Sequence, residues 1–266
     1  DVICTLIDQN IAAGRTSPHW HPRSRPAHLE GEAAGRAIDI ATYVGTPIHI
    51  FHVSCAAVVK KITQARAQGL PVTGETCPQY LFLTDKLYDR PGVDGTLPVC
   101  APPLRPQQDQ DNLWQALTRG ELQMVATDHC PFTKADKARG LEDFSQIPGG
   151  VPSIEMRFAA IYSKGVRERN LTLNQWVDIC CTQPARLMGL QSKGDLAIGR
   201  DADLVIFDPK VKRTLSVNTL HENIDWTPYD GHKIQGWPTT VLSRGKVIVA
   251  NQQFRGAAGD GRFIAR

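Results

Sequence analysis

Apolar and polar positions along the chain fall into blocks with either a helical or a strand-like period. Apolar residues at helical spacing, several times followed by a glycine, predict helices. We place them at 2–13, 30–43, 55–68, 108–118, 153–167 and 172–189. Short apolar runs predict strands at 47–53, 71–77 and 122–128. Strands that alternate with helices are typical of a parallel α/β architecture.

The segments between these blocks differ in length and character. Residues 15–27 are polar, contain Pro22 and Pro26, and predict a loop. A long loop is expected over 129–152, directly after the third strand, and loops of that length are usually functional or disordered. After Gly189 the pattern changes to short strands and tight turns, with a hairpin near 239–254. We therefore expect one α/β domain over 1–189 and a small β part over 190–266.

Composition and charge narrow the classes of function. The 266 residues are 41% hydrophobic and 21% charged, with a net charge of +3. No basic, aromatic-studded face is visible, so nucleic acid is not an expected partner. No apolar run approaches the roughly 18–20 residues of a membrane span. The seven cysteines are irregularly spaced and predict reduced thiols in a cytoplasmic protein, with Cys130 a small packing residue.

Candidate chemistry lies at the ends of two predicted strands. Asp128 follows the apolar run 122–126 in Thr-Asp-His-Cys-Pro-Phe, and His52 lies near the end of the run 48–53. Imidazole and carboxylate suit a metal that activates water. A core histidine and a helix or turn cap are the alternative interpretations. One other strand separates the two, so parallel strands would bring both residues to the same rim and favour a shared metal centre.

The other histidines are weaker candidates. His19 and His21 have the spacing of an H-x-H metal pair, but no apolar strand precedes them in the predicted loop. We therefore do not expect them to bind metal. His28, His221 and His232 lie in polar segments, where surface roles are expected.

Short strings in a fixed order over the whole chain resemble the cyclic amidohydrolases, and specifically their dihydropyrimidinase and hydantoinase branch. Glu-Thr-Cys-Pro-Gln-Tyr at 75–80 and Ala-Thr-Asp-His-Cys-Pro-Phe at 126–132 are specific to this branch. The further matching strings are Ser24-Arg-Pro26, His52-Val-Ser-Cys55, Pro102-Pro-Leu-Arg105, Asp143-Phe144, Ile147-Pro148, Thr182-Gln-Pro-Ala185, Gly199-Arg-Asp-Ala-Asp-Leu-Val205 and Leu242-Ser-Arg-Gly245.

The resemblance implies a (β/α)8 metallo-dependent hydrolase barrel with a small β-sandwich, of which this chain would be the C-terminal portion. The family's metal centre usually holds two zinc ions (Zn2+), bridged by a carboxylated lysine. Of its ligands, only a histidine and an aspartate match here, at His52 and Asp128. The bridging lysine and the other ligands are not present in this chain and would lie upstream of residue 1.

The resemblance also implies a substrate edge. The family binds a cyclic imide or ureide near a Ser-Pro-Pro-Leu-Arg string and an Ile-Pro-Asn-Gly string. The serine position is Ala101 here and the asparagine position is Gly149. Only main-chain groups remain at both positions for binding the substrate.

The function implied by the resemblance is hydrolysis of hydantoins or dihydropyrimidines to N-carbamoyl amino acids. Asp128 would be both a metal ligand and the catalytic proton carrier. A noncatalytic scaffold relative is one alternative, and an allantoinase or dihydroorotase type of enzyme is another. We expect a homo-oligomer at full length, and an incomplete, inactive site in these 266 residues alone.

Overall fold

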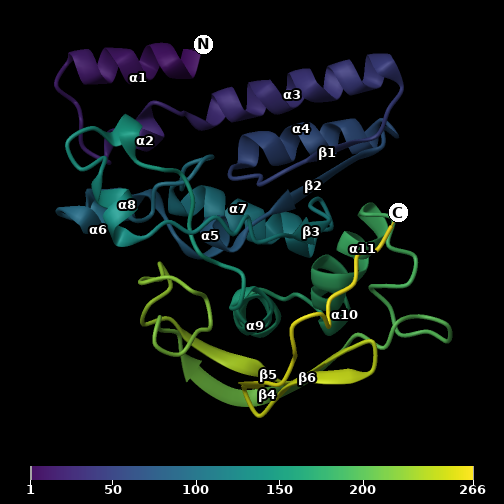
Figure 1. The fold of residues 1–266 in the computed structure, drawn as a ribbon. Helices are drawn as coiled ribbons and strands as arrows, with labels where there is room; N and C mark the ends of the chain where they lie inside the picture. Colours follow the sequence, from purple (N-terminus) through teal and green to yellow (C-terminus); the bar gives the residue numbers. More distant parts are fainter. Residues whose placement is uncertain (1, 266) are drawn as a thin grey trace. The chain divides into compact units, whose positions relative to one another are not determined.

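The computed structural model describes residues 2–265, and these form two compact units (Figure 1). The first unit contains the chain up to Arg157 together with Ser216–Asp230. The second contains Phe158–Leu215 and the chain from Gly231 onward. The predicted division into 1–189 and 190–266 stays a prediction, and the outermost positions of those ranges, 1 and 266, lie outside the described residues.

A three-stranded parallel sheet forms the centre of the first unit. Its strands are β1 (Ile48–Ile50), β2 (Val72–Thr76) and β3 (Met124–Val125), in the order β1-β2-β3. Ile48 pairs with Val72, and Glu75 pairs with Met124. The predicted parallel α/β character is therefore confirmed. The strands are shorter than predicted, because the chain leaves the sheet before His52 and Asp128.

Two helices lie side by side next to this sheet, α3 (Ala27–Val44) and α4 (Ala56–Ala67) (Figure 1). The buried residues of α3 recur at helical spacing, and the helix ends at Gly45 in the left-handed conformation that glycine favours. Helix α4 packs directly on β2, since a Cβ at Gly74 would lie 2.5 Å from Ile62 Cδ1. A larger residue at 74 would push α4 away from the sheet.

The remaining elements of the first unit confirm two predicted helices, as α1 and α7, and place short helices inside both predicted loops. They are α1 (Val2–Ala12), α2 (Trp20–Arg23), α5 (Pro78–Phe82), η1 (Asp85–Asp89), α6 (Val93–Thr96), α7 (Gln107–Thr118), α8 (Lys134–Ala138) and η2 (Phe144–Gln146). The expected loop over 15–27 thus contains α2, and the expected loop over 129–152 contains α8 and η2. Thr133 caps α8 through a reciprocal bond with Asp136, a local signal that the sequence reading passed over.

The second unit joins a group of short helices to an antiparallel sheet. Its helical elements are α9 (Arg157–Ile161), η3 (Tyr162–Val166), α10 (Leu173–Val177), η4 (Asp178–Thr182) and α11 (Gln183–Leu187), with Arg157 itself in the first unit. The helices predicted at 153–167 and 172–189 are present as continuous runs over 157–166 and 173–187, each containing one π-helical segment, η3 or η4. Trp176 packs against Phe158, with ring centroids 4.2 Å apart.

The sheet of the second unit has the order β4-β5-β6-β7. Its strands are β4 (Leu204–Thr214), β5 (Lys233–Ser243), β6 (Lys246–Ala250) and β7 (Gln253–Phe254). Antiparallel pairing of β5 with β6 confirms the hairpin predicted near 239–254. Within residues 2–265, none of the helices combines the length and apolar character that crossing a membrane requires.

Candidate functional site

His52 and Asp128 both lie just beyond the ends of strands, in unusual backbone conformations. His52 follows β1 with a φ of 39°, and Asp128 follows β3 with a φ of 47°. Residues other than glycine rarely adopt positive φ and are held there only when their surroundings fix them. Since β1 and β3 flank β2 in a parallel sheet, their ends meet at one edge. His52 lies beyond the end of β1 at Ile50, so the alternation of side chains along a strand does not set its direction.

Hydrogen bonds to β2 hold the chain in place directly after it leaves β1. The Val53 N–H donates to the Glu75 carbonyl at 2.8 Å, and the Thr76 hydroxyl donates to the Val53 carbonyl at 2.8 Å. Both Val53 and Thr76 are fully buried. The residue after His52 is therefore bonded on both sides of its main chain, and this limits the movement of the imidazole.

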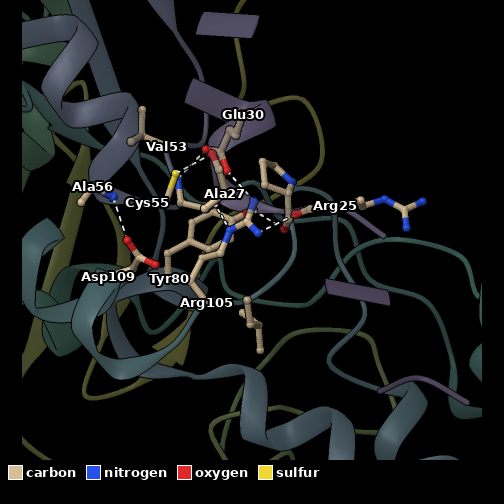
Figure 2. A network of polar contacts seen from close by, with 12 residues as sticks. Arg25, Ala27, Glu30, Val53, Cys55, Ala56, Tyr80, Arg105 and Asp109 are labelled. Carbon is tan, nitrogen blue, oxygen red and sulfur yellow. Dashed lines mark hydrogen bonds and ion pairs between the residues drawn. The ribbon is translucent and has the colours of Figure 1, made fainter. Parts of the chain in front are cut away.

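A buried ion-pair network extends this support to residues 54–56 (Figure 2). Arg105 donates to Glu30 Oε2 at 2.8 Å and to the Ser54 hydroxyl at 3.0 Å. The Ser54 N–H donates to Glu30 Oε1 at 2.9 Å, and the Ala56 N–H donates to Asp109 at 2.9 Å. Charge-assisted bonds of this kind are strong when water is excluded. The His-Val-Ser-Cys and Pro-Pro-Leu-Arg strings thus meet in one network.

Arg105 also contacts the Ser-Arg-Pro string at 24–26. Figure 2 shows Arg105 reaching the main chain of Arg25, whose carbonyl accepts its N–H at 2.6 Å. Arg25 belongs to the Ser-Arg-Pro string at 24–26. One function of these three strings is therefore to hold the chain that follows His52.

Asp128 lies in a polar environment that contains Gln79 of α5, Glu75 of β2 and His52, which follows β1. Gln79 Nε2 donates to Asp128 Oδ2 at 3.3 Å. Desolvation is the largest influence on Asp128 and raises the pKa of its carboxyl, and the charge of Glu75 raises it further. The charge of His52 and the bond from Gln79 act in the opposite direction. Although Asp128 is exposed as a residue, its carboxyl is thus partly removed from water and within electrostatic range of His52.

Glu75 and Gln79 belong to the Glu-Thr-Cys-Pro-Gln-Tyr string, which the sequence analysis used as a mark of the family and not as part of the site. Glu75 is 5% exposed on β2, between the two strands that precede His52 and Asp128. It accepts a bond from His49 Nε2 at 3.2 Å. Gln79 is fully buried on α5, and its Oε1 atom has no partner among the described residues. A glutamate inside a buried strand is the sequence signal that could have identified the first of them.

The two predicted substrate-binding positions lie next to each other. A Cβ built on Gly149 would lie 3.8 Å from the Ala101 amide nitrogen. The Gly150 N–H donates to the Val99 carbonyl at 3.0 Å and joins the two segments. Ala101 and Gly149 are both exposed. We call this pair of segments, 99–101 and 148–150, the substrate edge.

The donor chemistry near His52 and Asp128 fits a metal, but the set is incomplete. An imidazole and a carboxylate are ordinary zinc ligands, and catalytic zinc takes about three protein ligands. Within residues 2–265, no group of three or more His, Cys, Asp and Glu side chains is arranged to hold a metal ion. The unpartnered Gln79 oxygen is a further polar atom near this centre. Additional ligands would have to come from outside the described residues.

The remaining histidines bond elsewhere. His19 Nδ1 lies 2.5 Å from Asp89, whereas His21 is buried with Nε2 2.8 Å from the Cys100 carbonyl. His21 therefore supports the substrate edge, a role that its predicted loop did not indicate. His28 and His221 are exposed, and His221 pairs with Glu155 at 2.8 Å. His232 is half-buried.

The cysteines were expected to be reduced thiols. None of the seven, all of which lie within the described residues, takes part in a disulfide. Cys130, expected to be a packing residue, is exposed. It nevertheless adjoins the substrate edge, since a Cβ on Gly150 would lie 2.3 Å from the Cys130 carbonyl oxygen.

Comparison with known proteins finds relatives and solved structures named D-hydantoinase or dihydropyrimidinase. The chain is 45% identical to D-hydantoinase of Geobacillus stearothermophilus over 268 aligned residues, which cover 100% of this chain and 57% of the relative. It matches the crystal structure of dihydropyrimidinase from Brevibacillus agri with a TM-score of 0.98 and 46% identity. It matches D-hydantoinase from a Bacillus species with a TM-score of 0.97 and 47% identity. Both solved structures are matched over 99% of this chain and 58% of theirs.

These comparisons confirm the resemblance to the hydantoinase and dihydropyrimidinase branch. The chain spans somewhat more than half the length of these relatives. The model of the amidohydrolase family matches residues 26–248, which include the whole of the sheet edge with His52 and Asp128. By this match, the chain belongs to the amidohydrolase family.

Proposed function

We propose that this chain is part of a metal-dependent hydrolase that opens the cyclic amide of hydantoins or dihydropyrimidines to N-carbamoyl amino acids. One observation carries the proposal: His52 and Asp128 are both held at positive φ at one edge of a parallel sheet. Strained residues of this kind cluster at functional sites. The similarity to enzymes named D-hydantoinase and dihydropyrimidinase supports the choice of substrate class.

His52 and Asp128 would each hold one of two zinc ions. A carboxylated lysine outside this chain would bridge the two ions. When bound, the metals lower the pKa of water and make hydroxide available at neutral pH. The positions of both protein ligands are set by their neighbours: the Arg105 network holds the chain after His52, and Gln79 bonds Asp128.

Asp128 would also move the proton. Ring opening breaks the amide C–N bond, adds the water oxygen to the carbonyl carbon and requires a proton on the leaving nitrogen. A carboxylate can take that proton from the attacking water and deliver it to the nitrogen.

The substrate edge would orient the ring. Ala101 has only a methyl side chain and Gly149 has none, so recognition there uses main-chain N–H and C=O groups. These groups complement the alternating N–H and C=O groups of a cyclic ureide. The side chains elsewhere in the site would then determine which ring substituents are accepted.

The wider architecture forms part of the same proposal. Residues 1–189 would be part of a (β/α)8 barrel and residues 190–266 part of a β-sandwich. The strand order of the first unit and the separate antiparallel sheet of the second support this division. The full-length protein would be a cytoplasmic homo-oligomer acting on small molecules, and these 266 residues alone would be inactive.

Hydrolysis assays test this proposal. The whole encoded protein should be stripped of metal, reloaded with zinc and supplied with hydantoin, dihydrouracil, allantoin and dihydroorotate in parallel. We expect zinc-dependent release of N-carbamoyl amino acid from hydantoin or dihydrouracil. Turnover confined to allantoin or dihydroorotate would assign the alternative enzyme type. Absence of turnover on all four rings would favour a noncatalytic scaffold relative.

A further inference from the structure

Lys137 is a buried cation that the proposed mechanism does not use. It lies on α8 and is 0% exposed. Its Nζ atom donates to the Val99 carbonyl at 2.7 Å and to the Pro148 carbonyl at 2.7 Å. The Phe132 ring lies 5.7 Å away and offers its face to the charge. The ammonium is thus held inside the first unit by two main-chain oxygens.

Those two carbonyls belong to the two segments of the substrate edge. Val99 lies two residues before Ala101, and Pro148 immediately precedes Gly149. The Val99 oxygen also accepts the Gly150 N–H at 3.0 Å. The Lys137 ammonium therefore bonds both segments, in addition to the main-chain bond from Gly150 to Val99 that joins them directly.

Other hydrogen bonds hold the main chain on both sides of Ala101. The Cys100 carbonyl is bonded by His21, and the Pro102 carbonyl accepts the Tyr80 hydroxyl at 2.9 Å. The main chain is therefore held at Val99, Cys100 and Pro102, around Ala101. On the opposite segment, the side-chain bond to Pro148 comes from Lys137. Lys137 and the main-chain bond from Gly150 to Val99 therefore both hold the segments of Ala101 and Gly149 together.

Burying the Lys137 ammonium costs free energy, and this cost supports a role for the residue beyond packing. Lysine is almost never fully buried unless it is paired, because its charge loses the solvation of water. Burial here lowers the pKa of the Lys137 ammonium to about 8. An apolar side chain would fill the space without that penalty but could not bond two carbonyls at once. The three donors of an ammonium meet this requirement.

We propose that Lys137 is a positioning residue that sets the separation of Ala101 and Gly149 and thereby selects among cyclic ureides by ring size and shape. This inference rests on the proposed function for the identity of the ligand. The linkage of the two segments can be tested independently of any substrate.

The kinetic test compares Lys137→Met with Lys134→Met in the whole, zinc-loaded protein. Met preserves length, and Lys134 lies on the same helix but is exposed. For Lys137→Met we expect KM for hydantoin to rise about tenfold, the order expected for lost charge-assisted bonds, with kcat within about twofold of wild type. The ratio of kcat/KM between hydantoin and dihydrouracil should also change. The control should match wild type in all three quantities.

Hydrogen exchange followed by mass spectrometry provides the second measurement. In Lys137→Met, exchange should accelerate in peptides covering 98–104 and 146–152 and stay unchanged over β1 and β2. If this variant does not fold, Lys137→Gln retains one amide group with N–H donors and should give a smaller change of the same kind.

The outcomes separate this inference from the proposed function. An active wild-type enzyme whose KM and substrate ratio survive Lys137→Met would overturn the inference and leave the function intact. A wild-type protein inactive on every ureide would overturn the proposed function and the selection role with it. In that case, unchanged exchange at the substrate edge would also overturn the linkage.

Discussion

His21 provides the sharpest test of the packing around the substrate edge. It is 3% exposed, with one ring nitrogen on the Cys100 carbonyl and the other accepting from Arg25 at 3.2 Å. Desolvation lowers the pKa of His21 from 6.5 to about 3, and the charges of Arg25, Lys137 and Arg105 act in the same direction. The folded protein therefore keeps this imidazole neutral at pH values where the unfolded chain protonates it.

The direction and size of the effect of pH on the free energy of unfolding follow from the difference in His21 protonation between the folded and unfolded protein. The folded-state pKa is depressed, so the contribution of His21 to stability is complete above pH 6.5 and is lost as pH falls toward 3. Between those values the unfolded chain binds the extra proton, and each pH unit changes the free energy of unfolding by about 1.4 kcal/mol. Between pH 7 and pH 5 the loss from this one group amounts to about 2 kcal/mol.

Urea unfolding of the whole protein at pH 7 and at pH 5 measures this loss. His21→Gln keeps an N–H donor for the Cys100 carbonyl but cannot titrate. The free energy of unfolding of the wild type should therefore fall by about 2 kcal/mol more than that of the variant over this interval. His28→Gln, at an exposed ring, is the matched control and should behave as wild type. Equal pH dependence of wild type and His21→Gln would refute a neutral, buried His21.

Three further predictions concern the site itself. Asp128→Asn should lower kcat for ring opening in the whole protein by at least about 100-fold, because it removes both a charged ligand and the proton carrier; near-normal turnover would show that the role is wrong. Arg105→Lys removes the planar group that bonds Glu30, Ser54 and Arg25 together, and should reduce the free energy of unfolding by about 2–3 kcal/mol and weaken zinc retention. Unchanged urea unfolding and metal content would contradict that explanation. The 266-residue chain alone should lack full ring-opening activity, since it carries one candidate ligand per metal; purified chain with turnover equal to a full-length relative would refute this.

Much of the fold follows from local sequence signals. Helix α3 ends at Gly45, as the glycine and the apolar spacing predicted, and α4 and α7 match their predicted bounds within one residue. The three strands occur in the predicted order and are parallel. These features are predictable because they depend on residues only a few positions apart, through helix periodicity, glycine conformation and strand alternation.

The site was predictable only in part. The residue types His52 and Asp128 carry the chemistry in the sequence, but their positive φ values do not follow from any local pattern. The pairing of Arg105 with Glu30 joins residues 75 positions apart and depends on the packing of α3 near the site. Lys137 lies in a segment that reads as a polar loop, and it is buried where its ammonium bonds the Val99 and Pro148 carbonyls. Long-range packing of this kind has no signature in a single sequence.

The proposed function requires that His52 and Asp128 hold metal at one edge of the sheet. Crystals of the whole protein grown with zinc, with anomalous difference density recorded at the zinc absorption edge, test it most directly. We expect one peak about 2.0–2.1 Å from a ring nitrogen of His52 and one about 2.0–2.2 Å from a carboxylate oxygen of Asp128. A hydrolytically active protein whose zinc peaks lie away from both residues would contradict the account.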